Sequence, residues 1–139
     1  MPTLEQRKGA TFRDLGILDG RLLANVKAMG IKVPTEVQDS AIRGLISGDR
    51  DVIIHAHTGS GKTLAYLLPL IATVNPGSNA LQAIVVAPGR ELASQIFSVC
   101  EKLVAGLDLR GAMVIGGANI LRQMEKIKRL KPQVPYSYP

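Results

Sequence analysis

The chain has 139 residues, of which 46% are hydrophobic and 20% charged, and this composition predicts one folded domain with a single core. No apolar run approaches the roughly 20 residues of a membrane span, and residues 1–8 lack the apolar stretch of a secretory signal. We therefore expect an intracellular, soluble protein without membrane contact, in a compartment that the sequence does not specify. A formal net charge of +6 favours a polyanionic partner.

The first third of the chain predicts a polar N-terminal arm over residues 1–11 and then two helices. Asp19 and Gly20 open the first helix, and Gly30 is placed to end it in the left-handed conformation. Pro34 prevents its continuation, so that a second helix starts at Thr35 and ends at Gly48.

Thr35 and Gln38 have the spacing of a capping box, in which Thr35 caps the helix and Gln38 bonds back to the Thr35 amide. The same rigid turn could serve a second purpose, because a glutamine amide can bond adenine N6 and N7 together. Spacing alone favours the capping box, and the surrounding residues have to decide between the two interpretations.

Residues 56–63, AHTGSGKT, lie between an apolar run at 52–54 and another at 64–68. This order predicts a strand, a glycine loop and a helix, the context that phosphate-binding loops require. Gly59 and Gly61 let successive backbone N–H groups turn toward an anion, and the helix N-terminus adds its dipole. Lys62 would reach the β- and γ-phosphates, and the Thr63 hydroxyl would hold Mg²⁺. Ala56 stands where the strict pattern has glycine, and the alternative is a plain connecting loop.

The remainder of the chain alternates apolar strands with helices. Residues 81–87 predict a buried parallel strand, 91–103 a helix, 109–115 a third strand and 120–130 a last helix with Ile120, Met124, Ile127 and Leu130 facing inward. Residues 132–139 contain three prolines, which predict a tail that neither continues a helix nor forms a central strand.

Four segments together resemble the DEAD-box ATP-dependent RNA helicases. They are Phe12, residues 30–38, residues 56–63 and residues 88–93, similar to the upstream aromatic, the Q motif, motif I and motif Ia of that family. Two positions depart from it: Ile31 replaces the usual phenylalanine, and Gly89 replaces a threonine. The glycine pair after the third strand resembles the family's doublet beside the RNA backbone.

This resemblance implies an α/β fold: a three-layer parallel sheet forming a RecA-like P-loop NTPase domain, truncated, with residues 12–131 as the partial helicase ATP-binding domain and 132–139 as a Pro/Tyr-rich tail. It implies ATP and Mg²⁺ as cofactors and RNA as partner, on a monomer whose protein partners the sequence does not reveal. Lys62 and Thr63 would serve phosphoryl transfer, with Thr63 as the metal ligand. The residues implied for ATP are Phe12, Gln38, His57, Thr58, Gly59, Ser60, Gly61, Lys62, Thr63 and Leu64, and those for RNA are Arg90, Gly116 and Gly117.

The family's later motifs, the Asp-Glu-Ala-Asp box among them, do not occur in these 139 residues. Phosphoryl transfer needs an acidic residue that shares Mg²⁺ and an arginine at the transition state. We therefore expect ATP and RNA binding here, and hydrolysis coupled to unwinding in a complete protein. The alternatives are a non-catalytic ATP- and RNA-binding fragment and another P-loop NTPase or kinase.

Overall fold

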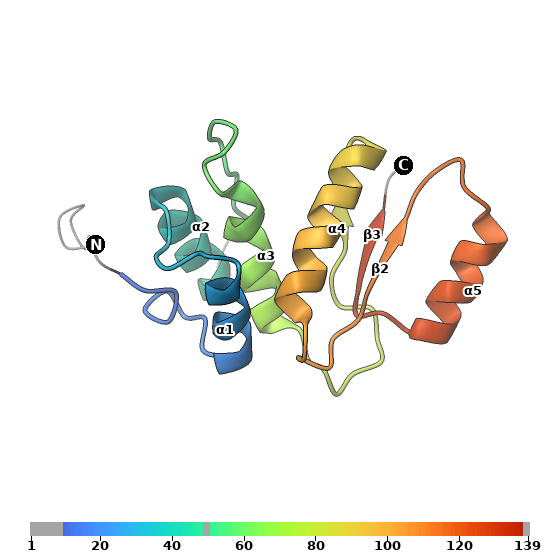
Figure 1. Cartoon of the computed structure of the whole chain (residues 1–139), viewed down its shortest axis with the longest axis horizontal. Coiled ribbons are helices and arrows are strands. Elements are labelled where there is room, and N and C mark those ends of the chain that lie inside the picture. The colour runs from blue at the N-terminus through green and yellow to red at the C-terminus, as the bar shows by residue number, and fades with distance from the viewer. Residues whose placement is uncertain (1–9, 49–50, 138–139) are drawn as a thin grey trace. The chain divides into compact units, whose positions relative to one another are not determined.

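A computed structural model describes residues 10–48 and 51–137 (Figure 1). The chain forms two compact units, Met1–Thr73 and Val74–Pro139. We call them the phosphate-loop unit and the sheet unit. Most of the predicted N-terminal arm, residues 1–9, and the last two residues of the predicted tail lie outside the described residues.

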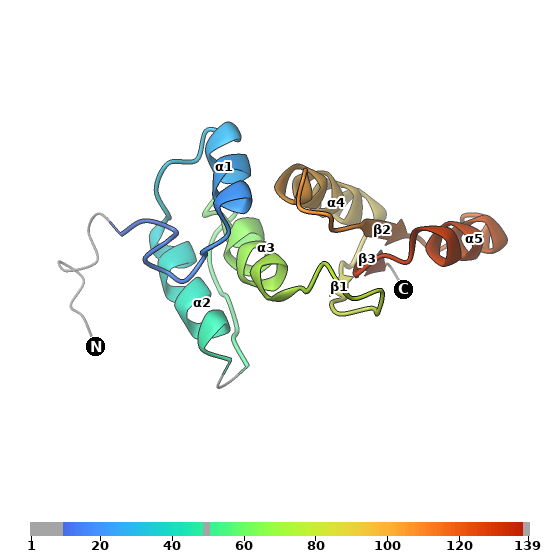
Figure 2. The same ribbon diagram turned by 90° about the horizontal axis from the view of Figure 1, so that it is seen from below.

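Three helices build the phosphate-loop unit: α1, Gly20–Ala28; α2, Glu36–Ser47; and α3, Lys62–Thr73. Asp19 caps α1 through the amides of Arg21 and Leu22, and Gly30 and Gly48 have φ values of +81° and +69°, as predicted for helix ends. Helices α2 and α3 pack side by side (Figures 1 and 2). The core of this unit is apolar and comprises Phe12, Leu15, Ile17, Leu22, Val26, Ala41, Ile42, Leu64, Ala65, Leu67, Leu68 and Ile71.

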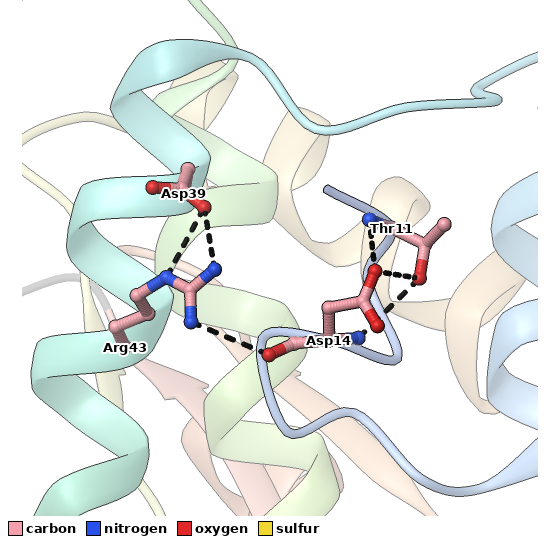
Figure 3. Close-up of polar contacts among 4 residues, drawn as sticks. All are labelled: Thr11, Asp14, Asp39 and Arg43. Atoms are coloured by element: carbon pink, nitrogen blue, oxygen red, sulfur yellow. Dashed lines mark hydrogen bonds and ion pairs between the residues drawn. The ribbon is translucent and has the colours of Figure 1, made fainter. Parts of the chain in front are cut away.

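The turn before α1 is fastened to α2 by Arg43 (Figure 3). The Arg43 guanidinium forms an ion pair with Asp39 at 3.2 Å and donates to the backbone carbonyl of Asp14 at 3.3 Å. Thr11 donates its amide and its hydroxyl to the Asp14 carboxylate at 2.7 and 2.8 Å. These two bonds, the backbone one first, lower the pKa of Asp14 below its usual 3.8. The turn is thus held by charge-assisted bonds next to the buried Phe12.

The strand predicted at 52–54 is absent from the described structure: residues 51–57 belong to no strand, and Ile53 is 95% exposed. A strand exists only through hydrogen bonding to a neighbouring strand. The ladders in the described residues all lie in the other unit, so this apolar run has no pairing partner and the sequence-based prediction was wrong.

The sheet unit alternates strands and helices in the order β1, Val85–Val86; α4, Arg90–Val104; β2, Gly111–Val114; α5, Ile120–Leu130; and β3, Val134–Ser137. Among the described residues the sheet has three strands in the order β1-β3-β2, and both neighbouring pairs are parallel. The predicted α/β class with a parallel sheet is therefore confirmed.

Strand β3 corrects the prediction for residues 132–139, because it is the central strand of the sheet although it contains Pro135. Pro135 is in register with Ala112 of β2, whereas the pairs with β1 begin at Tyr136. Toward β1, the described bonds are accepted by the Gln133 carbonyl and the paired register begins at Tyr136, so none of them needs an N–H at Pro135.

Two further predictions in this unit overestimated burial. Strand β1 is shorter than the predicted 81–87, and Ile84 and Val86 are 58% and 67% exposed. Helix α5 has its predicted bounds, but none of its residues is buried, and Ile120 and Met124 are exposed rather than packed inward. The helix itself was predicted correctly, but no other described residues cover its apolar face.

Candidate functional site

The loop before α3 curls around the side chain of Lys62. The Lys62 ammonium donates to the backbone carbonyls of Ala56 and His57, the second at 2.7 Å. Gly59 and Gly61 have φ values of +85° and +86°, a conformation that other residues rarely adopt. The loop therefore has the backbone shape of an anion cradle, with a cation at its mouth and the N-terminus of a helix at its end.

Ser60 supplies an observation that fits an anion in this loop. Its hydroxyl oxygen is buried and has no hydrogen-bond partner within the described chain, although buried polar atoms are normally paired. His57 and Thr58 are exposed at the tip of the loop. Leu64 is buried in the core, so it could contribute only backbone to a bound phosphate.

Thr63, the predicted metal ligand, lies in the first turn of α3 and shares a side-chain hydrogen bond with Tyr66. Burial raises the pKa of the Tyr66 phenol above its usual 10.0, and the bond with Thr63 acts weakly in the other direction. The residues that the structure describes contain no group of three or more His, Cys, Asp or Glu able to hold a metal ion. The role of Thr63 as a metal ligand stays a prediction.

Gln38 joins the turn before α2 to the phosphate loop. The predicted capping box is confirmed: the Thr35 hydroxyl accepts from the Gln38 amide at 3.3 Å, and Gln38 Oε1 accepts from the Thr35 amide at 2.9 Å. In addition, Gln38 Nε2 donates to the Gly61 carbonyl at 3.1 Å, and the Thr35 hydroxyl donates to the Ser60 carbonyl at 3.0 Å. Adenine recognition by Gln38 stays a prediction, because its side chain is 2% exposed and both ends of its amide are engaged.

Phe12 lies in a different environment from Gln38. Its ring is 4% exposed and lines a cavity of about 580 Å³ together with Leu23, Val26 and Ile31, with Lys27 and Lys32 also on the wall. Gln38 is not among the residues lining this cavity. Phe12 thus shares this cavity with Ile31, one of the two positions where the sequence departs from the family, and the predicted contact of Phe12 with adenine stays a prediction.

Arg90 and Gly117, two of the residues predicted for RNA, meet in the sheet unit. Arg90 is the exposed first residue of α4, and a Cβ built on Gly117 would overlap its guanidinium. Gly117 is exposed with φ +74°, and Gly116 is half-buried beside it. An arginine fork beside a glycine turn is an arrangement suited to a phosphate.

Sequence reasoning missed Gln123, which bonds to both backbone groups of Ile115 just ahead of this glycine pair. A signal was present: Gln123 shares helical spacing with Ile120 and Ile127, so that a polar residue interrupts an apolar face. Polar residues on such faces usually have a defined hydrogen-bond partner.

A lysine-bearing glycine loop that opens a helix, together with a parallel α/β sheet, defines the class of P-loop nucleotide-binding proteins. Residues 35–139 match the family model described as DEAD/DEAH box helicase. Since this match covers most of the chain, the chain belongs to the DEAD/DEAH box helicase family. No helix in the described ranges is long and apolar enough to cross a membrane.

Individual relatives agree with this assignment. The chain is 46% identical over 105 residues to the probable ATP-dependent RNA helicase YfmL of Bacillus subtilis, covering 76% of this chain and 28% of the relative. It is 38% identical to the DEAD-box ATP-dependent RNA helicase 47, mitochondrial, of Arabidopsis thaliana, covering 93% of this chain and 26% of that one. The chain thus spans little more than a quarter of these curated relatives.

Solved structures give the same result for the fold. Mss116p bound to single-stranded RNA and AMP-PNP aligns with a TM-score of 0.86 and 32% identity, covering 100% of this chain and 30% of that one. Dbp5 of S. cerevisiae bound to RNA and ADP BeF3 aligns with a TM-score of 0.81 and 31% identity, covering 93% and 32%. The predicted RecA-like helicase fold is confirmed.

Proposed function

We propose that this chain is the ATP-binding front part of an ATP-dependent RNA helicase. The observation that carries the proposal is the link from Gln38 to Gly61, which fastens the glutamine turn to the glycine loop around Lys62. A plain connecting loop has no need of such a link. A nucleotide site gains from it, because a preorganised cradle loses less entropy on binding.

Each residue of the loop has a proposed role in holding ATP. Lys62 exchanges the carbonyls of Ala56 and His57 for the β- and γ-phosphates, and the backbone of Gly59 and Gly61 lines the cradle. The buried Ser60 hydroxyl gains a partner it lacks in the described structure. Thr63 would hold Mg²⁺, which neutralises charge on the phosphates when bound.

Gln38 and Phe12 are the proposed determinants of adenine selectivity. For Gln38 to read the adenine edge, at least one of its bonds, to Thr35 or to Gly61, has to be exchanged for one to the base. Because Gln38 also holds the loop, recognition of the base is coupled to the shape of the phosphate cradle. Phe12 would act from the cavity that it shares with Ile31.

RNA is the proposed partner of the sheet unit, where Arg90, Gly116 and Gly117 would contact the phosphate backbone. The positive net charge supports this, and Mss116p and Dbp5 are themselves bound to RNA in the solved structures. Hydrolysis and unwinding are proposed for the complete protein, because the loop alone does not provide the acid and arginine that phosphoryl transfer uses.

Thermal melting of the purified chain tests the nucleotide site. Mg-ATP at 100 times its dissociation constant should stabilise the protein by about 2.7 kcal/mol, while the same concentration of Mg-GTP should add much less. Lys62→Ala should abolish the shift, and the exposed Lys128→Ala, a lysine of α5, serves as the matched control that keeps it. If Mg-GTP raises the melting temperature as much as Mg-ATP does, another P-loop NTPase is favoured. If Mg-ATP does not raise it at all, the proposal is refuted.

A further inference from the structure

Gln123 makes a bidentate contact with the backbone at the end of β2. Its Oε1 accepts from the Ile115 amide at 2.8 Å, and its Nε2 donates to the Ile115 carbonyl at 3.0 Å. Ile115 follows directly after the last residue of the strand, beyond the described pairs of the ladder with β3. Gln123 thus satisfies both backbone polar groups of this one residue.

The same contact fixes the start of the glycine turn. Ile115 is joined directly to Gly116, and the turn ends at Asn119, whose side chain caps α5 by accepting from the Arg122 amide at 3.1 Å. The segment is thus fastened at both ends by side chains of α5 or its cap. Between these two points lies Gly117, where a Cβ would overlap the guanidinium of Arg90 as that side chain is placed.

Packing alone does not fix α5 in this position. Helix α5 contacts β2, but none of its residues is buried, and Ile120, Leu121 and Met124 are 67%, 72% and 47% exposed. Apolar contacts between flat faces allow small sliding movements, whereas two hydrogen bonds to one peptide group define a position and an orientation. The register of α5 against β2 therefore depends on Gln123.

We propose that Gln123 is a positioning residue for RNA binding: it sets the Gly116–Gly117 turn against Arg90 so that the backbone N–H groups and the guanidinium meet one phosphate together. This rests on the proposed function of the sheet unit. Gln123 itself touches no RNA; its contribution is the preorganised geometry of the turn. Loss of its two bonds leaves the charge of the protein unchanged but lets the turn depart from Arg90.

The chain contains a matched control for this idea. Gln82 makes the same kind of contact, accepting from the Asn75 amide at 2.9 Å and donating to the Asn75 carbonyl at 2.8 Å, in a loop that contains none of the residues predicted for RNA. Gln123→Met and Gln82→Met therefore each remove one bidentate bond to backbone with a side chain of similar length. A merely structural role predicts the same behaviour for both variants.

The experiment measures the affinity of the full chain for single-stranded RNA by fluorescence anisotropy, well below the melting temperature of every variant. Gln123→Met should weaken RNA binding about three- to tenfold, because the displaced turn would lose one or two modest hydrogen bonds to the phosphate, while Gln82→Met should bind like the wild type. Both should keep the thermal shift with Mg-ATP. Hydrogen exchange at the Ile115 amide should accelerate in Gln123→Met alone.

Gln123→Asn is a second variant in case the methionine prevents folding, since it keeps a solvated amide that is one methylene too short to reach Ile115. Equal RNA affinity of a folded Gln123 variant and the wild type would overturn the inference. So would equal weakening by the Gln82 variant. If the wild-type chain binds no RNA although its Ile115 amide is protected, the RNA part of the proposed function fails, and the inference fails with it.

Discussion

Gln38 donates from its side-chain amide to the carbonyl of Gly61, 23 residues further along the chain, at 3.1 Å. Beside this bond the Thr35 hydroxyl donates to the Ser60 carbonyl at 3.0 Å. The turn that caps α2 therefore holds two consecutive peptide groups of the phosphate loop. A helix cap usually satisfies only its own helix, whereas this one also shapes the loop that begins α3.

Gly61→Ala should destabilise the protein more than Gly59→Ala does. Both glycines have φ near +85°, so an alanine is strained at either position by about 1 kcal/mol or more. A Cβ on Gly61 would also overlap Gln38 Nε2, while a Cβ on Gly59 meets open space. Urea unfolding of the two variants measures the difference. Equal losses would show that the contact with Gln38 does not constrain the loop.

Gln133→Leu should cost the protein about 3 kcal/mol of stability, estimated from two backbone groups left without partners. The fully buried Gln133 side chain accepts from the Arg110 amide at 3.0 Å and donates to the Ser78 carbonyl at 3.0 Å. It thereby joins the segments before β1, β2 and β3. The exposed Gln82→Leu is the control and should cost much less. Similar urea midpoints for the two variants would contradict this role.

Arg90→Met should weaken RNA binding and lower the slope of log affinity against log salt concentration by about 1, because one cation no longer displaces a counterion. Arg122→Met is the control, because it also removes one exposed positive charge from the sheet unit. Comparing the two variants distinguishes a specific contact of Arg90 with RNA from a general loss of positive charge. Titrations at several salt concentrations give both slopes. If the two variants change the RNA affinity and the salt slope equally, Arg90 makes no specific contact with RNA.

Local sequence signals predicted the helices of this protein well, since each depends on residues close together in the chain. The cap at Asp19, the capping box at Thr35 and the left-handed glycine Gly30 lie where the sequence placed them. Strands depend on distant partners, and there the predictions failed: residues 52–54 have no described partner, and residues 134–137 form a central strand in spite of Pro135.

The candidate site shows the same division between local and distant information. The glycine loop around Lys62 follows from eight consecutive residues, but the link between Gln38 and Gly61 and the meeting of Arg90 with Gly117 are tertiary contacts. Two glutamines with structural roles, Gln123 and Gln133, were not singled out. Their importance comes from backbone groups 8 and 23–55 residues away, which no local pattern reveals.

Tyr66 should make the stability of the protein fall as the pH rises above 10. Burial raises the pKa of its phenol in the folded state above the usual 10.0, which the unfolded chain retains. Below pH 10 both states are protonated and the stabilising contribution is fully present. Above it the unfolded state loses its proton first, so the free energy of unfolding decreases until the folded pKa is passed.

Tyr66→Phe isolates this effect from the titration of the lysines, because it removes the phenol and leaves every other group in place. The variant also loses the bond to Thr63, which lowers its stability at every pH. Between about pH 8 and about pH 11, the wild type should therefore lose more stability than Tyr66→Phe, as measured by urea unfolding. Parallel curves over this range would mean that the Tyr66 phenol titrates alike in the folded and unfolded protein.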